Sequence, residues 1–330
     1  MIKQETIGKF NLTKSGDLLM KYTALNTFAL NFLGGSANIL MGRVQQRIEG
    51  FSGKYFTNKN LYNASYQYKK FLADFMKETA SRRPHTFAGL LMRKFDVMQN
   101  FGEQARMTEM NRRGAWRLLN SRNLFFLNTM GEHFLYTRTF LAYADTIKLT
   151  LNGNPIKLVD AFEMKKINGI EELAIKKGVK NEDGSDFTDA NINDISRTAA
   201  DINQKLNGIY NRDDVAAAQY YVLGRMTAMF RKWIPTALQR RFGKEHYNYI
   251  TNEVEKGFYN SFFNDFIWQS IRDMKNGQFR LASAWSRLDD NTKAGVRAAL
   301  AEMGIWAFAG LLMPVIFGAL GWDDDDDNDS

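Results

Sequence analysis

Residues 303–322 read MGIWAFAGLLMPVIFGALGW, a run of 20 residues without a charged side chain. An α-helix rises about 1.5 Å per residue, so this run would form a helix about 30 Å long, close to the hydrocarbon thickness of a bilayer. We expect Pro314 to kink the helix, because its ring collides with the carbonyl of Gly310. The run therefore either crosses a membrane or is buried in a protein assembly. The residues expected to make that contact are Trp306, Phe308, Leu311, Leu312, Pro314, Ile316, Phe317 and Trp322.

Charged residues flank the apolar run on both sides. Asp323 to Asp327 follow it directly in an acidic tail, residues 323–330, and Lys293 and Arg297 precede it. If the run spans a membrane, the positive-inside tendency keeps the Lys/Arg side in the cytoplasm. We expect the tail to hold the end of the helix in water.

Composition favours a folded, helical and basic protein. The chain has 330 residues, 45% of them hydrophobic, with 4 prolines and no cysteine. Few prolines favour long helices, and the lack of cysteine excludes disulfides and thiolate metal sites. Removing the six tail acids leaves 44 basic against 30 acidic residues, a balance of +14 over residues 1–322. Such a body is suited to nucleic acid, anionic lipid or acidic partners.

Apolar spacing predicts helices along most of the chain. Residues 22–42 carry no charge but contain three asparagines, so we expect a buried helical hairpin with a break at Gly34-Gly35 rather than a membrane segment. Residues 61–80 form a helix, and residues 87–148 form two or more. Further helices are expected at 188–209, from Asp213 to a stop before Pro235, at 245–276, and from Asp289-Asp290 onward.

One segment changes to strand periodicity. Ile147, Leu149 and Leu151 alternate with polar residues, Asn152-Gly153 follows, and Ile156 and Leu158 resume the alternation. Asn-Gly suits the primed turns of β-hairpins, so we predict a hairpin there, as the sole β element. Residues 176–189 are polar and are expected to form a surface loop.

The expected fold is mostly α: an elongated multi-helix bundle with one small β-hairpin insertion and a C-terminal apolar helix. We divide the chain into a helical region 1–146, a hairpin and loop insertion 147–187, a second helical region 188–302, the apolar helix 303–322 and the acidic tail 323–330.

No motif for an enzyme is present. The histidines His85, His133 and His246 lack partners at metal-binding spacing, and the acidic loop from Asn181 to Asp189 lacks the glycine position and closing glutamate of a calcium loop. We therefore expect no catalytic, cofactor-binding or metal-binding residues.

A basic cluster with interleaved aromatic residues is a second candidate site. Arginine can pair with phosphates, and aromatic rings can stack on bases or lie at lipid headgroups. A solvated or assembly-facing helix surface would show the same pattern. The cluster comprises Arg225, Arg231, Lys232, Trp233, Arg240, Arg241 and Lys244.

Three phrases of the sequence resemble a known family. They are residues 31–43 with Ile48-Glu49-Gly50 and Tyr55-Phe56, residues 206–211 (LNGIYN), and residues 230–235 (FRKWIP) with Arg240-Arg241. Together they resemble the C-terminal portion of the large virion-associated proteins of crAss-like tailed phages, over about residues 20–322. The resemblance implies a protein that is packaged in the particle and ejected with the DNA. Because this chain is far shorter, we expect a split gene product or a piece of a longer chain.

Three functional hypotheses follow. The favoured one is a non-enzymatic virion protein, which assembles with portal, tail or cargo chains and is delivered at infection. The second is a membrane-inserting channel or anchor in the host envelope, and the third is a nucleic-acid-binding accessory that uses the basic cluster. The expected location is the virion and, after infection, the host membrane or cytoplasm.

Overall fold

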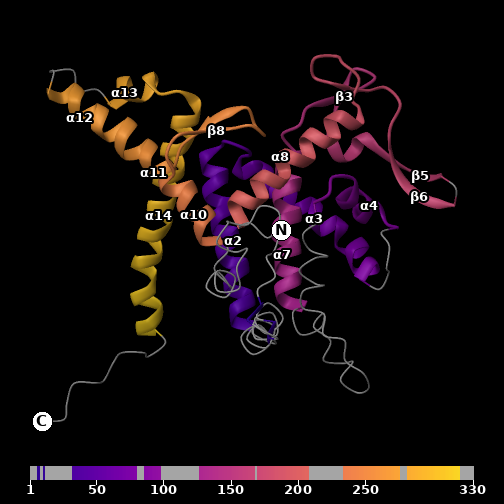
Figure 1. The fold of residues 1–330 in the computed structure, drawn as a ribbon, viewed down its shortest axis with the longest axis horizontal. Coiled ribbons are helices and arrows are strands. Elements are labelled where there is room, and N and C mark those ends of the chain that lie inside the picture. Colours follow the sequence, from indigo (N-terminus) through magenta and orange to yellow (C-terminus); the bar gives the residue numbers. More distant parts are fainter. Residues whose placement is uncertain are drawn as a thin grey trace, which may run out of the picture.

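The computed structural model describes residues 6–7, 10–11, 32–79, 85–97, 126–167, 169–207, 233–275 and 281–319. Within these ranges the chain is mostly helical, which confirms the predicted fold class (Figure 1). The helices are α2 (Phe32–Ser52), α3 (Asn58–Thr79), α4 (Phe87–Lys94), α7 (Phe126–Ala144), α8 (Asp189–Asn207), α10 (Trp233–Phe242), α11 (Phe258–Asn260), the π-helix η4 (Ser261–Ile267), α12 (Trp268–Lys275), α13 (Leu281–Arg287) and α14 (Asp290–Ala319), with a 3-10 turn η2 (Leu158–Ala161).

The larger hydrophobic core lies where α3, α7 and α8 meet the strands of the insertion. Phe140 of α7 is fully buried, and its ring centroid lies 5.0 Å from that of Phe95, which follows α4. Leu61 of α3 and Ile202 of α8 are buried in the same cluster. Burial of large apolar side chains is the dominant stabilising term in a domain of this kind, so this cluster anchors the body of the protein.

A buried polar cluster fixes how α2, α3 and α7 lie against one another. The Arg138 side chain of α7 donates to Ser65 Oγ (2.8 Å) and to Gln46 Oε1 (2.7 Å), and Gln46 Nε2 donates to Leu135 O (2.9 Å). Burial, together with the charge of nearby arginines, lowers the pKa of Arg138 to about 10, so it remains a cation at neutral pH. Because buried polar groups are costly when unpaired, these bonds select one register of the three helices.

The predicted hairpin is confirmed, with β3 (Leu149–Leu151) and β4 (Asn154–Ile156) joined at Asn152-Gly153. Both turn residues have positive φ, 51° and 83°, as a primed turn requires. The expectation that this hairpin is the sole β element is wrong. The other strands are β1 (Thr6–Ile7), β2 (Phe10–Asn11), β5 (Phe162–Ile167), β6 (Ile170–Ile175), β7 (Val179–Asn181), β8 (His246–Asn248) and β9 (Glu253–Glu255).

These strands form small antiparallel pairs: β1 with β2, β5 with β6, β8 with β9, and β7 on the free edge of β3. The predicted surface loop 176–189 therefore contributes a strand. Burial at the two ends of this segment explains the difference, because Val179 and Phe187 lie in the core while most of the polar residues between them are exposed.

Two helix predictions are wrong in their bounds. α2 runs from Phe32 to Ser52 without a break at Gly34-Gly35, and the first part of the predicted hairpin, residues 22–31, lies outside the described residues. The predicted helix 245–276 begins only at Phe258, since β8 and β9 occupy its first part. Their turn contains Asn252 at φ 53°, a left-handed conformation that asparagine tolerates and that ends a helical run.

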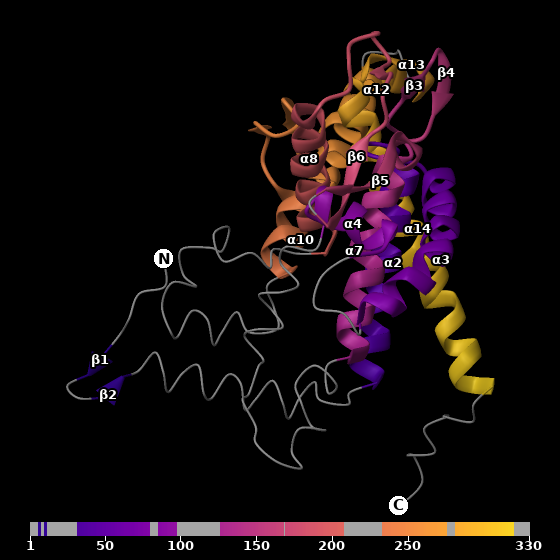
Figure 2. The same ribbon diagram turned by 90° about the vertical axis from the view of Figure 1, so that its right-hand side faces the viewer.

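The prediction that a helix ends before Pro235 is wrong. Pro235 lies in the first turn of α10, where a missing N–H is tolerated. The helix expected from Asp213 falls outside the described residues up to Trp233. α14 begins at Asp290, as predicted, and continues through Pro314 to Ala319. Figure 2 shows that α2, α7 and α14 extend past the other helices at one end of the molecule.

Candidate interaction helix

The first half of α14 is packed into the body of the protein. Ala298 and Ala299 form a second hydrophobic cluster with Ile48 of α2 and Phe258 of α11. The approach to η4 is close, because a Cβ atom at Gly295 would lie 2.8 Å from Ser261 Oγ. Larger side chains would push these helices apart, so the small residues at this base hold α14 against α2, α11 and η4.

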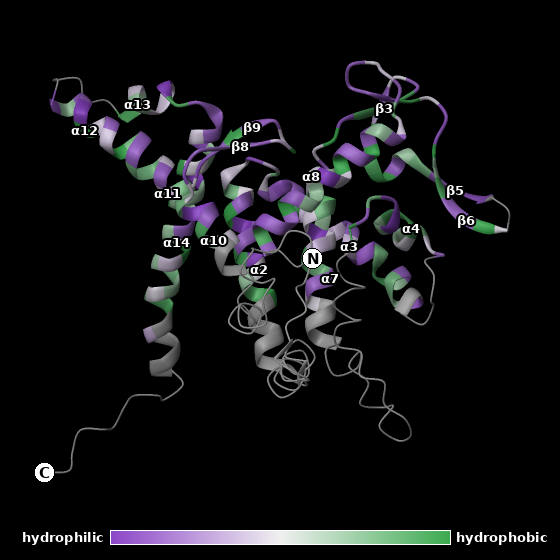
Figure 3. Cartoon of the chain, in the orientation of Figure 1, coloured by the Kyte–Doolittle hydropathy of each residue, from purple (hydrophilic) through white to green (hydrophobic). Residues whose placement is uncertain are grey.

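The second half of α14 is exposed on most of its circumference. The exposed fractions are 51% for Trp306, 63% for Phe308, 75% for Leu311 and 39% for Leu312. Ala307, Gly310 and Pro314 are exposed too. At about 100° per residue, these seven positions cover most of the directions around the helix axis. Figure 3 shows the accompanying change in hydropathy, from purple at the base to largely white and green beyond it.

Such exposure is unusual for an apolar helix of a globular domain. By length and composition, α14 is the one helix in the described part of the chain that could cross a membrane. Only 22% of its most apolar stretch, within Asp290–Leu312, is buried. A core helix of similar composition would be mostly buried, and a helix that is apolar all round needs a non-aqueous surrounding. The predicted residues Ile316 and Phe317 lie on α14 with only their backbone described, and Trp322 lies outside the described residues.

Two buried ion pairs lie at the point where α14 leaves the body. Glu302 is 2% exposed and accepts hydrogen bonds from the Arg241 guanidinium, while Glu49 accepts from Arg240 at 2.8 Å. Arg240 also donates to Gln45 Oε1 at 2.8 Å. Removing one partner of a buried pair leaves an uncompensated charge, so these contacts lock α10 onto α2 and α14.

These pairs change the interpretation of the basic cluster. Arg240 and Arg241 already bind carboxylates of the same chain, so their charge is not available to an anionic partner without breaking those pairs. Lys244 is exposed. Trp233 opens α10 with only its backbone described, and Arg225, Arg231 and Lys232 fall in the part of the chain that is not described. The cluster as a binding surface stays a prediction.

A third set of charged groups surrounds Glu255 of β9. Its Oε1 accepts hydrogen bonds from Tyr55 Oη (2.7 Å), Lys205 Nζ (2.7 Å) and Lys54 Nζ (3.1 Å). Burial on its own would raise the pKa of Glu255, but the two lysines and the Tyr55 hydroxyl outweigh it and lower the pKa to about 2. These groups satisfy one another, so the network holds the β8–β9 hairpin against α8 rather than offering a reactive group.

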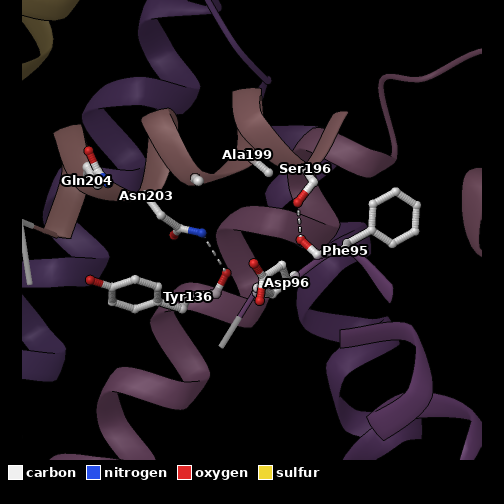
Figure 4. Close-up of a pocket in the computed structure, with 9 residues that line it drawn as sticks. Phe95, Asp96, Tyr136, Ser196, Ala199, Asn203 and Gln204 are labelled. Carbon is white, nitrogen blue, oxygen red and sulfur yellow. Dashed lines mark hydrogen bonds between the residues drawn. The ribbon is translucent and has the colours of Figure 1, made fainter. Parts of the chain in front are cut away.

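One small cavity lies in the described part of the chain. It measures about 20 Å³ and lies between α8, α7 and the end of α4, lined by Asp96 and Asn203 among others (Figure 4). Ser196 Oγ donates to Phe95 O at its edge (2.5 Å). Such a space holds about one water molecule, whereas ligand pockets usually measure about 300–1,000 Å³. Within the same ranges, no group of three or more His, Cys, Asp or Glu side chains is placed to hold a metal ion.

Sequence reasoning missed Glu49 and Glu302. Glu302 is the last charged residue before the apolar run, and a carboxylate at that place needs a partner once it is buried. That signal was present in the sequence. The identity of the partner was not, because Arg241 is 61 residues away.

Comparisons of the chain with family models, with curated proteins and with solved structures find no match.

Proposed function

We propose that the chain is a non-enzymatic virion protein of a tailed phage, which is packaged in the capsid or tail and delivered with the genome at infection. The phrases at residues 31–56, 206–211 and 230–241 support the phage lineage by resemblance. The observation that carries the physical part of the proposal is the division of α14. Its first half is held in the body by the Glu302–Arg241 ion pair and by close packing of small residues. Its outer half is apolar, uncharged and exposed. Its task is attachment to a non-aqueous partner rather than catalysis.

Purified particles test this proposal directly. Mass spectrometry of the particles of the phage that encodes the chain should detect it at a constant ratio to the portal protein. A gene with a stop codon in place of Met303 removes the outer half of α14 and keeps the Glu302–Arg241 pair. We expect this version to be packaged at least about tenfold less, since apolar anchors dominate such contacts. Leu281→Glu, on α13, is the control. Absence of the intact chain from particles would refute the proposal.

A further inference from the structure

In α2, α7 and α14, the charged residues closest to the projecting end of each helix lie at nearly the same height along the helix axes. α2 and α7 run parallel, because Cβ atoms at Gly42 and Gly131 would touch Leu135 and Ile39, respectively. Gln46, one turn further along α2, bonds Leu135 O and Thr139 Oγ1. The Arg43 level of α2 therefore lies within about one turn of Glu132 in α7.

α14 runs antiparallel to α2, and its boundary residue Glu302 lies at the height of Arg43. Arg297 Nε donates to Ser52 O (2.9 Å), and Ala299 packs with Ile48. Four residues further on in α14, and four residues back in α2, Met303 and Val44 pack against the same cluster. Both steps advance about 6 Å in the same direction, so Glu302 and Arg43 mark one height.

Beyond this height, the sequence of all three helices is uncharged. The uncharged runs are residues 22–42 before Arg43, residues 123–131 before Glu132, and residues 303–322 after Glu302. Leu40 and Met41 of α2 are 63% and 42% exposed, like the apolar residues of α14. Figures 1 and 2 both show these helix ends projecting together from the body.

Basic side chains form a collar at the same height. Arg43 and Arg47 of α2 are exposed, and so are Lys69 and Lys70 of α3. The α3 pair lies at this level because Tyr68 Oη is 3.2 Å from His133 Nδ1 of α7. α3 continues past this level and carries Asp74 and Lys77 there, so it is not one of the inserted helices. Lysines and arginines at such a boundary attract anionic lipid headgroups.

We propose that the ends of α2, α7 and α14 beyond Arg43, Glu132 and Glu302 enter a lipid bilayer together, with the basic collar at the headgroups. A protein partner that packs along one side would cover one stripe of α14, whereas the exposed positions extend over most of its circumference, as lipid contact requires. A level shared by three helices far apart in sequence matches the planar boundary of a bilayer. The inference rests on the proposed function for the role of α14 and adds lipid as the partner and α2 and α7 as further inserted elements.

Vesicle flotation tests the inference with the full chain. The probe is a vesicle of phosphatidylethanolamine and phosphatidylglycerol, and the variants are Leu40→Glu and Leu311→Glu, with Leu281→Glu as the control. Leu281 is 51% exposed and lies on α13 at the far end of the molecule (Figure 1). We expect the intact chain to float. Leu311→Glu should lower partitioning at least about tenfold and Leu40→Glu about threefold, because the cost of a charge grows with depth. Leu281→Glu should float as the intact chain does, and circular dichroism checks that all variants fold.

Two outcomes would overturn the inference. If Leu311→Glu prevents flotation and Leu40→Glu matches the control, α14 inserts alone. If the intact chain does not float, lipid is not the partner, and detection of the chain in particles still decides the proposed function. A chain that floats as described but is absent from particles would support the bilayer contact and refute the virion role.

Discussion

The two halves of α14 show how one helix can belong to two environments. Residues 290–302 obey the rules of a globular domain, with small side chains turned inward and the Glu302 carboxylate paired by Arg241. Residues 303–314 break those rules, because apolar side chains face outward in most directions. The first half depends on this chain for its stability. The second half depends on a partner outside this chain. Substitutions in the first half should therefore change the free energy of unfolding, and substitutions in the second half should change association with other molecules.

The largest effect is expected in the core of the body. Phe140→Ala removes a fully buried ring that packs on Phe95, and should lower the free energy of unfolding by about 3–5 kcal/mol. Urea denaturation followed by far-ultraviolet circular dichroism measures it, with detergent present throughout. A loss below about 1 kcal/mol would mean that the body is not a close-packed core.

Glu302→Gln comes next, since it tests the joint between the halves. The substitution leaves the Arg241 guanidinium without its charge partner in a poorly hydrated site and should cost about 3 kcal/mol. Glu182→Gln is the matched control, because the Lys148–Glu182 pair is exposed (side chains 73% and 68%) and should contribute less than about 1 kcal/mol. Equal effects of the two substitutions would show that the base of α14 is not locked by this pair.

The Glu255 network predicts a loss of stability in acid. The pKa of Glu255 is lowered to about 2 in the folded protein from its ordinary value of 4.5, so its contribution is complete above the unfolded pKa and is lost as the pH falls from about 5 toward 2. The loss should reach about 2–3 kcal/mol. Unfolding free energies of the wild type and of Glu255→Gln, measured from about pH 7 down to about pH 3, cover most of the range in which the contribution is lost. The variant should start lower and show a shallower slope; parallel slopes would contradict the assignment.

The sequence predicted α14 well because its signal is local. The signal consists of an uncharged run, a start at Asp289-Asp290 and a stretch with few prolines, and all of these lie within or next to the helix itself. It also predicted the β3–β4 hairpin, since Asn152-Gly153 specifies a turn by itself. It failed at β8–β9, where aromatic and polar residues such as Tyr247 and Asn248 suit a helix as well as a strand, and at β7, which was predicted as a loop. In both places packing against the rest of the chain decides the structure.

The joint at Glu302 and the common level of Arg43 and Glu302 could not be predicted either. Both depend on which residues of α2, α10 and α14 face each other across long separations. Periodicity locates the apolar face of a helix but not its neighbour. For that reason, the same arginines that looked like a phosphate-binding cluster proved to be the partners of buried carboxylates.

The smallest effect on stability should come from a substitution in the outer half of α14. Such a substitution distinguishes the two halves most clearly, because it should change self-association instead. Leu311→Ala removes a side chain that is 75% exposed, so in water the free energy of unfolding should change by less than about 0.5 kcal/mol. The same change should matter for self-association, because exposed apolar patches drive aggregation. Analytical ultracentrifugation without detergent should show oligomers of the intact chain and more monomer after truncation at Glu302, with Leu311→Ala between them. A monodisperse monomer of the intact chain would mean that this half of α14 finds its cover within the molecule, and the comparison between the two halves would then fail.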